Sequence, residues 1–495
     1  MTATGGHMSL KLSSTLKNLF WIAALLSVFA GLAISQAQPT KKQRKQADDL
    51  AKAGDKSYQQ RNYRNAIDQY AQSLALVSVN PELHAKKANA HYLLKEYDPA
   101  LTDLNAALEQ KYQRPLDIYK LRAMVRFEKG DFDGSLADIR EVLKVEPANT
   151  MFILKEADIN SAQGNDNDAL NAYQRAVAAD SRNGDLYYKI AVLQMKTGHT
   201  DAQIGAAQEA IKYNTQFLAD SYYMVADGYW NKRQYNEAGP AYVSAIERWK
   251  ATGSIKPELN TSYRNLGDIY RRTNRLNDAI RITNQGIADF PKDGGLWTDL
   301  SWYYSLADRN PEAVEAARSA IAFAPKDSLP YTNLCRAYNE TKEYQLAVNS
   351  CNQALKIKPD DGETYFYLGR GYDLLGIAAE DGGRKAEANR FKREATNAYD
   401  KAVTGLVKFT RDNPDYSDGF YLLGNAYFAD EQTENAIAAY KKCLELSPRF
   451  IKARFNLGLI YALGKKKAEA MEQYNSLLPL DSTYAAKLKA EIDKL

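Results

Sequence analysis

A unit of about 34 residues recurs along this chain, and each copy is too short to fold alone. The interval of 34 separates Tyr427 from Tyr461, and it separates Tyr270, Tyr304, Tyr338 and Tyr372 from one another. In the copy at 420–448, apolar residues recur at helical spacing on both sides of a polar turn at 430–432. Pro448 ends the second helix because proline lacks the N–H that would continue it. The sequence therefore predicts a stack of helical hairpins, each burying its apolar faces against its neighbours.

Small residues mark the places where the two helices of each hairpin come closest. In the first helix they are Gly54, Ala88, Ala123, Ala157, Ala191, Ala226, Gly267, Ser301, Cys335, Gly369, Gly424 and Gly458. Most second helices carry an alanine at the facing position. With this pattern the chain resembles the tetratricopeptide repeat family over about residues 47–481. The resemblance implies an all-α, right-handed superhelical solenoid of about twelve helix-turn-helix repeats.

The spacing also predicts how the chain is divided. We expect a signal peptide or membrane anchor at 1–37, a basic linker at 38–46, and repeats one to six at 47–252. Repeats seven to twelve follow at 253–481, and a capping helix at 482–495 covers the exposed end. Two intervals are too long: Ala238 and Ala279 are 41 positions apart, and Ala347 and Ala395 are 48 apart. The second excess predicts an insertion near 377–394, with lengthened charged helices around a Gly382–Gly383 turn.

The N-terminal residues do not share the repeat. Lys11 and Lys17 precede an uncharged apolar run at 19–34, and the small residues at 35 and 37 suit a signal peptidase. We expect export to the periplasm or the extracellular space, with cleavage after Ala37. The alternative is an uncleaved anchor at 19–34, because the basic residues after Pro39 oppose translocation. The membrane is a partner only through this segment.

Composition and motifs argue against several classes of function. The 65 Lys and Arg nearly balance the 61 Asp and Glu, so we expect no nucleic acid as partner. No nucleophile, phosphate-loop or metalloprotease motif occurs, so we predict no enzyme, no cofactor and no metal site. His84 and His91 stand seven apart without a third ligand, and we interpret them as solvated surface residues. Cys335 and Cys351 occupy facing positions of one hairpin; we expect two buried thiols, with a bridge as the alternative.

The family resemblance implies that the first helices line a concave groove, and that the groove binds an extended peptide or a helix of another protein. The register assigns these residues to the groove: Tyr223, Asp227, Trp230, Arg264, Asp268, Arg271, Thr298, Trp302, Thr332, Arg336, Asn339, Phe366, Arg370, Tyr421 and Asn425. Their arginines offer bidentate donors to carboxylates, and their tryptophans are anchors of the kind that dominate interface energies.

We therefore expect a non-enzymatic scaffold of the cell envelope that binds a partner protein in its groove. The alternative is binding of a glycan or cell-wall polymer, with Trp230, Trp302 and Tyr421 stacking on sugar rings. Members of the family that capture acidic chaperone tails use a Lys/Asn/Asn/Lys/Arg clamp. The matching positions here hold Ala51, Asp55, Lys86, Asp117 and Leu121, so that partner class is disfavoured.

Overall fold

The computed structural model describes residues 38–495, and within them the chain is helical without a strand. The chain separates into two compact units, the first ending at Ser181 and the second running from Arg182 to Leu495. The predicted signal peptide or anchor lies outside the described residues. Among the helices that are described, none is long and apolar enough to cross a membrane.

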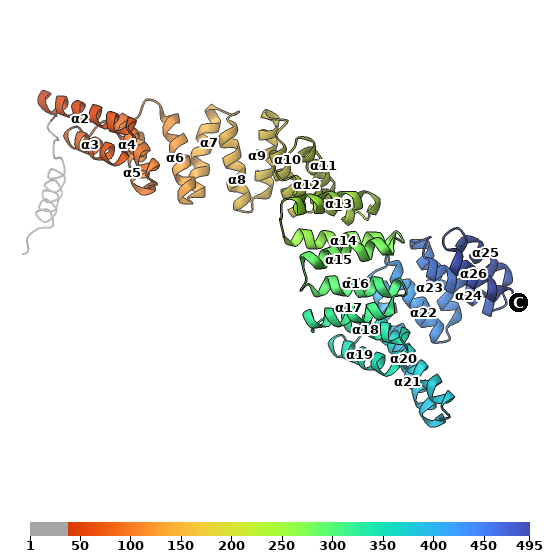
Figure 1. Cartoon of the computed structure of the whole chain (residues 1–495). Helices are drawn as coiled ribbons and strands as arrows, with labels where there is room; N and C mark the ends of the chain where they lie inside the picture. Colours follow the sequence, from red (N-terminus) through yellow and green to blue (C-terminus); the bar gives the residue numbers. More distant parts are fainter. Residues whose placement is uncertain (1–37) are drawn as a thin grey trace, which may run out of the picture. The chain divides into compact units, whose positions relative to one another are not determined.

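Within residues 38–181, the first unit contains four antiparallel helix pairs, drawn in red to yellow in Figure 1. Its helices are α2 (Lys41–Gln59), α3 (Tyr63–Leu76), α4 (Pro81–Leu93), α5 (Tyr97–Glu109), α6 (Pro115–Lys129), α7 (Phe132–Val145), α8 (Thr150–Ala162) and α9 (Asp166–Ala179). Each helix packs on the next along the chain, as the repeat predicts.

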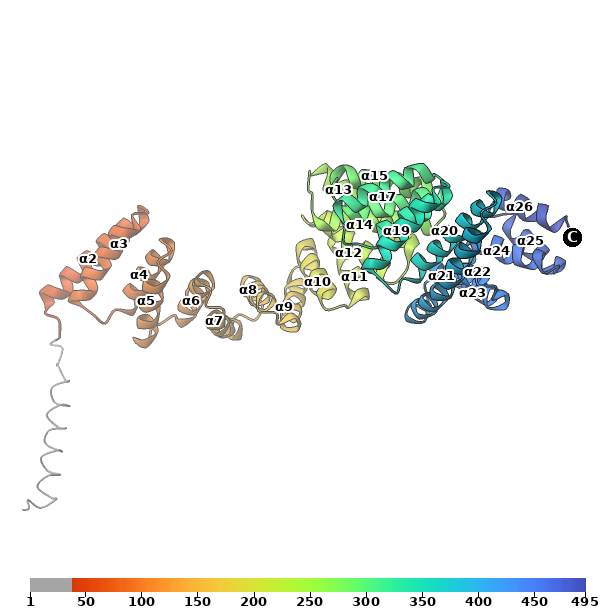
Figure 2. The same cartoon turned by 90° about the horizontal axis from the view of Figure 1, so that it is seen from below.

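The second unit contains eight further pairs and a final single helix (Figure 2). Its pairs begin with α10 (Gly184–Lys196), α11 (Thr200–Lys212), α12 (Leu218–Asn231), α13 (Tyr235–Ala251), α14 (Pro257–Arg272), α15 (Leu276–Asp289), α16 (Gly294–Leu306) and α17 (Asn310–Phe323). They continue with α18 (Leu329–Glu340), α19 (Tyr344–Ile357), α20 (Gly362–Asp381), α21 (Lys385–Asp412), α22 (Ser417–Ala429), α23 (Thr433–Leu446), α24 (Ile451–Leu463), α25 (Lys467–Leu477) and α26 (Ser482–Ile492). The twelve pairs and the closing helix confirm the predicted all-α tetratricopeptide-type solenoid.

The hairpins close by fitting a large residue of the second helix against a small residue of the first. A Cβ atom added to Gly424 would lie 2.6 Å from the ring of Tyr440, and one added to Gly54 would lie 2.4 Å from the ring of Tyr70. The tyrosine hydroxyl then reaches the next polar residue of the first helix: Tyr70 donates to Asp55 at 2.8 Å. The glycines are therefore required because any side chain would occupy the space of the ring.

The basic segment at 38–46 is not the linker that the sequence predicts. Helix α2 begins at Lys41, and Thr40 and Gln43 form a capping box at its start. The backbone N–H of Gln43 donates to the Thr40 hydroxyl, and the backbone N–H of Thr40 donates to the Gln43 side chain. Because this box begins the helix, the basic residues occupy its first turns, and Ala47 is already buried.

The tenth pair, α20 and α21, is longer than the others. These helices have 20 and 28 residues, against 13 and 14 in the next pair. Gly383 turns the chain between them with a positive φ of 71°. At the other end of the pair, Phe409 of α21 packs edge-on against Tyr416, with ring centroids 5.8 Å apart. The last turns of α21 therefore support the segment that leads into α22.

Candidate functional site

The inner surface of the second unit carries two adjoining cavities. The larger has a volume of about 530 Å³, is bounded by α16, α18, α20, α21, α22 and α24, and is called the chamber. The smaller, the side pocket, has about 450 Å³ and runs along α16, α18, α20, α22 and α24. The residues that line both are Leu306, Arg336, Tyr367, Tyr421 and Lys452. The two cavities thus share a wall and form one groove.

Two ion pairs join helices that are far apart in the sequence. Arg271 of α14 lies 3.1 Å from Asp418 of α22, 147 residues later, and their side chains are 8% and 14% exposed. Arg233, after α12, lies 3.1 Å from Asp415. We call these two ion pairs the latch. Because Asp418 also lines the chamber, the latch lies at its wall.

Aromatic and aliphatic side chains make up much of the chamber wall. Trp302 projects from α16 into the chamber, and the guanidinium of Arg271 lies over its ring at 4.4 Å. From the opposite side, Tyr421 packs against Phe450 with ring centroids 5.0 Å apart. Leu306, Leu329, Leu406 and Leu422 also line the chamber. An enclosed, largely apolar surface of this kind suits a ligand that loses its hydration on binding.

Most carboxylates of the chamber are paired with a basic residue of the chain. Lys358 donates to Asp361 at 2.7 Å, and Lys408 donates to Asp360 at 3.0 Å. Glu363 differs, because its closest cation, Arg336, is 4.0 Å away. Burial of Glu363 raises the pKa of its carboxyl to about 7, although the Arg336 charge acts in the opposite direction.

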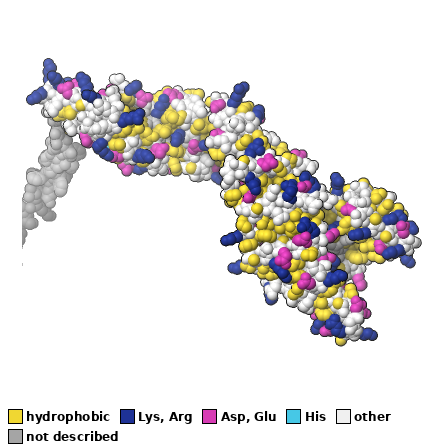
Figure 3. Space-filling view, viewed as in Figure 1, with side chains coloured by type: hydrophobic (Ala, Val, Ile, Leu, Met, Phe, Trp, Pro, Cys, Tyr) yellow, Lys and Arg dark blue, Asp and Glu magenta, His cyan; other side chains and the backbone are white. Residues whose placement is uncertain are grey.

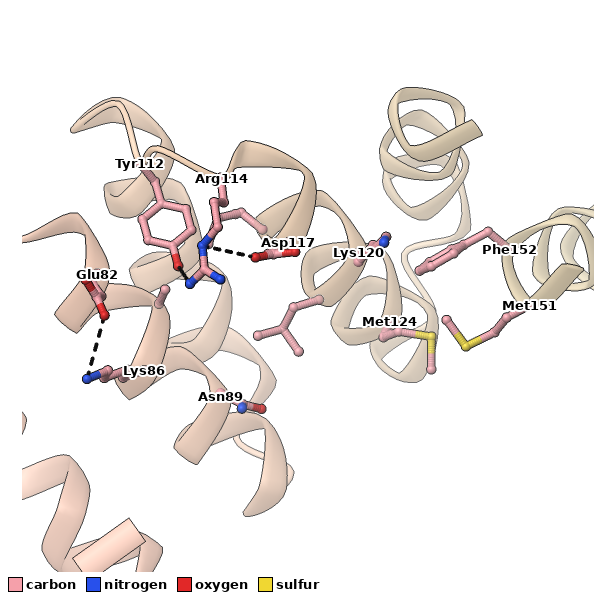
Figure 4. Close-up of a pocket in the computed structure, with 13 residues that line it drawn as sticks. Glu82, Lys86, Asn89, Tyr112, Arg114, Asp117, Lys120, Met124, Met151 and Phe152 are labelled. Atoms are coloured by element: carbon pink, nitrogen blue, oxygen red, sulfur yellow. Dashed lines mark hydrogen bonds and ion pairs between the residues drawn. The ribbon is translucent and has the colours of Figure 1, made fainter. Parts of the chain in front are cut away.

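The first unit has a cavity of its own, of about 440 Å³, between α4, α6 and α8 (Figure 4). Arg114 bridges its upper edge, donating to the Tyr112 hydroxyl at 2.8 Å and pairing with Asp117 at 3.5 Å. Met124 and Met151 face each other across the opposite end. Its charges are therefore held by neighbouring repeats, and no residue from a distant repeat closes it within the described part of this unit.

The structure brings five of the predicted groove residues together. The chamber or the side pocket is lined by Trp302, Arg336, Arg370, Tyr421 and Asn425. Thr298 and Phe366 also reach these cavities, although both are largely buried.

Other predicted groove residues are buried or form hydrogen bonds and ion pairs within the chain. Asn339 is 3% exposed and donates to the Tyr367 carbonyl at 2.9 Å, and Thr332 is 1% exposed. Arg264 pairs with Asp299 at 2.8 Å, while Asp268 pairs with Arg271. The prediction that Asn339 and Thr332 face the groove is wrong, because the stacking of α18 against α20 buries them.

The predicted groove residues of α12, which are Tyr223, Asp227 and Trp230, are half-buried and lie outside both cavities. The ring of Tyr223 packs against Trp249 at 5.8 Å, and burial raises the pKa of Tyr223 to about 12. Trp230 meets Tyr235 edge-on at 5.4 Å. Burial also raises the pKa of Asp227. These contacts give α12 a packing role.

The register did not identify several residues of the groove. Lys452 was missed because it stands near the start of α24, away from the central small residue. Tyr416 and Asp418 were missed because the register does not place repeat eleven opposite repeat seven. A signal for them exists: Ala395 and Ala436 are 41 positions apart, and these extra residues form the last turns of α21.

Two further expectations from the sequence are corrected. His84 and His91 are not solvated: their side chains are 16% and 10% exposed, and His84 lies 2.8 Å from Asp103. His91 lies 2.7 Å from Glu96, so each histidine faces a carboxylate of its own repeat. Cys335 and Cys351 form a disulfide, because the two facing small positions of one hairpin bring their Cα atoms to 5.3 Å.

Models of tetratricopeptide repeats match most of this chain in segments. Matches described as tetratricopeptide repeat cover residues 51–115, 154–217, 223–295 and 330–361, and one described as TPR repeat covers 424–464. These ranges include helices of both units.

Relatives share only part of their length with the chain. It is 29% identical over 142 residues to small glutamine-rich tetratricopeptide repeat-containing protein 2 of Saccharomyces cerevisiae, which is 28% of this chain and 40% of that protein. It is 35% identical over 85 residues to a UDP-N-acetylglucosamine–peptide N-acetylglucosaminyltransferase of Giardia intestinalis, 17% of this chain and 6% of that protein. The chain thus spans less than half the length of these relatives.

Two solved structures are also among those similar to this chain. A tetratricopeptide repeat protein from Parabacteroides merdae is 13% identical, with a TM-score of 0.37 over 55% of this chain and 98% of that one. Yeast Tom70 is 14% identical, with a TM-score of 0.33 over 90% of this chain and 96% of that one.

Proposed function

The chain belongs to the tetratricopeptide repeat family, and from this premise we propose that it is a non-enzymatic scaffold that binds a segment of another protein in the groove of its second unit. The observation that carries the proposal is the joining of the chamber and the side pocket along Arg336, Tyr367 and Tyr421. A groove of two linked cavities matches an extended segment with several side chains better than a single compact group.

The polar residues of the side pocket support a peptide as the ligand. Asn425 and Asn456 lie next to each other, and Asn456 donates to the Asn425 side-chain oxygen at 2.9 Å. Amide side chains of this kind can donate to and accept from a peptide backbone. The glycan alternative finds less support, because Arg271 lies over Trp302 and the ring of Trp230 is packed against Tyr235.

The surface charge also supports a protein partner. On the face shown in Figure 3, basic and acidic side chains are interspersed over both units without a large patch of one sign. The net charge of +4 is small for a chain of this length. Nucleic-acid binding draws on clustered positive charge, so this distribution favours a protein segment.

We place this function in the cell envelope, either outside the cytoplasmic membrane or attached to it. The support is the Cys335–Cys351 disulfide, since disulfides persist in oxidising compartments. The test is non-reducing peptide mapping of protein from its natural source after thiol blocking. A linked peptide pair containing both cysteines is expected, and two blocked thiols would contradict the placement.

Photo-crosslinking tests the groove as the binding site. Benzoylphenylalanine is introduced in place of Tyr421, which lines both cavities, and in place of Phe323, an exposed aromatic residue of α17 outside them. Illumination in the producing cells is expected to attach a partner protein at position 421 and not at position 323. Equal adducts at both positions, or none at 421, would overturn the proposal.

A further inference from the structure

Helix α2 is the first described helix of the first unit, and its outer face carries a stripe of basic residues. The basic residues of α2 are all exposed, and they are Lys41, Lys42, Arg44, Lys45, Lys52 and Lys56. At 3.6 residues per turn, Lys41, Lys45, Lys52 and Lys56 fall within about 60° of one another around the helix axis. Ala47 and Gly54, which are buried, fall on the opposite side. The stripe therefore points away from the helices on which α2 packs.

The chain provides few carboxylates for this stripe. Within residues 38–495, none of the six basic residues forms an ion pair, and Arg44 donates to the Pro39 carbonyl at 3.2 Å. Asp55 of α2 is bonded to the neighbouring helices instead, because it accepts from the Tyr70 hydroxyl at 2.8 Å and from Lys86 at 3.0 Å. The other acidic residues of the helix are Asp48 and Asp49. Six exposed cations thus share two carboxylates.

The basic residues also stand at the end of α2 where a cation is least favourable. Three of its first four residues are basic, and no acidic residue lies in the first turn. The helices α4, α5, α6 and α7 each have an acidic residue there. Because the N-terminal end of a helix has a partial positive charge, cations at this end are repelled and an anion is attracted. An external anion beside Lys41 and Lys42 would offset both effects.

The helix at the other end of the stack shows that a cap does not need such a stripe. Helix α26 and the residues after it also cover an end of the solenoid, for which a polar outer face is sufficient. Their charges are paired with one another: Lys494 lies 2.7 Å from Glu491, and Lys489 pairs with Asp493. Solubility of the end therefore does not explain the unpaired cations of α2.

The sequence before α2 indicates which anion this stripe meets. The uncharged apolar run at 19–34 ends seven positions before Lys41, and seven extended residues span at most about 25 Å. A run of this kind held in a membrane keeps the start of α2 near the lipid headgroups. Lys41 and Lys56 are about 22 Å apart along the helix axis. A charged surface can contact the whole stripe at once, whereas a single free phosphate contacts one or two residues.

We propose that the outer face of α2 binds the anionic headgroups of a phospholipid surface, with the helix axis along that surface. Each lysine or arginine close to an anionic membrane strengthens the association by about fivefold. This inference goes beyond the proposed function, because it assigns a membrane contact to the first unit and does not involve the groove of the second. The membrane contact then extends from the N-terminal segment into the folded repeats.

Lysine acetylation in the presence of lipid vesicles tests the proposal on the full chain. Vesicles of phosphatidylcholine with 30% phosphatidylglycerol are compared with vesicles of phosphatidylcholine alone, and mass spectrometry measures the rate at each lysine. We expect the anionic vesicles to slow acetylation of Lys41, Lys45, Lys52 and Lys56 by about fivefold or more. The neutral vesicles should have no effect on these rates. Sodium chloride at 0.5 M should remove the protection, because salt screens exposed charges.

A second basic run provides the matched control. Lys465 and Lys467 are exposed and lie next to each other in the turn before α25 and at its start, far from the apolar run in the sequence. Their acetylation should be the same with both kinds of vesicle. The double variant Lys52→Gln, Lys56→Gln should lower the protection of Lys41 severalfold, whereas Lys465→Gln, Lys467→Gln should leave it unchanged. Circular dichroism shows whether each variant is folded.

Three outcomes would overturn the proposal. Equal protection by neutral vesicles would show that the headgroup charge is not recognised. Equal protection by a single-stranded oligonucleotide at the same phosphate concentration would make the stripe a nucleic-acid site. No protection by any of them would leave α2 as a polar cap. Each of these results leaves the photo-crosslinking at position 421 as a separate test of the groove.

Discussion

The inner surfaces of the two units are built from the same hairpins but are closed by different contacts. In the first unit, ion pairs between repeats link neighbours: Lys86 reaches Asp55, and Lys129 reaches Asp98. In the second unit, the Arg271–Asp418 pair links the seventh repeat to the eleventh. The first unit thus has an open cavity along a regular stack, whereas the second encloses a chamber. The repeat itself does not decide which of the two arises.

We attribute the difference to the length of one helix, α21. Hairpins of the first unit have helices of 13 to 19 residues, while α21 has 28. The extra C-terminal turns of α21 carry Phe409, which packs against Tyr416 immediately before Asp418. Long-range closure therefore follows from a local change of length. A solenoid can acquire an enclosed site without adding a domain.

Removing the buried Arg271–Asp418 pair of the latch should have the largest effect on the free energy of unfolding, and it tests the comparison of the two units directly. Arg271→Met leaves Asp418 buried without a cation, and we expect the second unit to lose about 3 kcal/mol of unfolding free energy. The tryptophans at 230, 249, 297 and 302 report this unfolding by fluorescence during denaturation with urea. Hydrogen exchange should also increase in 413–422, where α22 begins.

The matched control lies in the first unit. Arg64 pairs with Glu96, but its side chain is 61% exposed. Arg64→Met should therefore cost less than about 1 kcal/mol and leave exchange in α22 unchanged. If both arginine variants had the same small effect, the latch would be an ordinary surface pair and the contrast between the units would disappear.

The hairpins and their order could be predicted from the sequence because small residues must stand where two helices touch. The same reasoning identified Trp302, Arg336 and Tyr421 as groove residues, since first-helix positions face inward in every repeat. It could not show which inward-facing side chains bond to other residues of the chain and are therefore not free to bind a partner. Arg271 is an example, because its partner Asp418 is 147 residues away and only the curvature of the whole unit brings them together.

For the cysteine pair, too, the sequence predicts one property and not another. The register places Cys335 opposite Cys351, so their proximity follows from the sequence. Whether the thiols are oxidised depends on the compartment, which the register does not encode. Lys452 was missed for a different reason: its position near the start of α24 becomes part of the groove only when α24 folds back toward α18.

The titration of Glu363 is expected to have an intermediate effect on the unfolding free energy of the second unit. It tests the contrast between the chamber and the open cavity of the first unit. Its carboxyl faces Arg336 on α18, Asp418 on α22, and Lys358 and Asp361 before α20. Burial raises its pKa from the usual 4.5 to about 7. The folded protein therefore binds more protons than the unfolded chain between these values. The stabilisation is complete below the pKa of the unfolded chain, 4.5, and is lost as the pH rises through the pKa of the folded protein, about 7.

The unfolding free energy of the second unit is expected to fall by about 1 to 2 kcal/mol between about pH 5 and pH 8. Urea denaturation followed by tryptophan fluorescence at several pH values measures it. Glu363→Gln should flatten the profile, whereas Glu445→Gln, on an exposed pair with Lys442, should leave it unchanged. An identical slope in the wild type and Glu363→Gln would show that Glu363 does not titrate in this range.

The smallest effect concerns the turns, which in both units place either a glycine or a residue with a Cβ atom in the left-handed conformation. Gly164 in the first unit has a φ of 78°, and Glu431 in the second has a φ of 60°. A left-handed conformation costs a residue with a Cβ atom about 1 kcal/mol relative to glycine. Gly164→Ala should thus destabilise the first unit by about 1 kcal/mol, and Glu431→Gly should stabilise the second by about 0.5 kcal/mol after the entropy of glycine is counted. Circular dichroism follows the first change and tryptophan fluorescence the second. A stabilising effect of Gly164→Ala would mean that its turn does not need the left-handed conformation, although Gly164 has a φ of 78°.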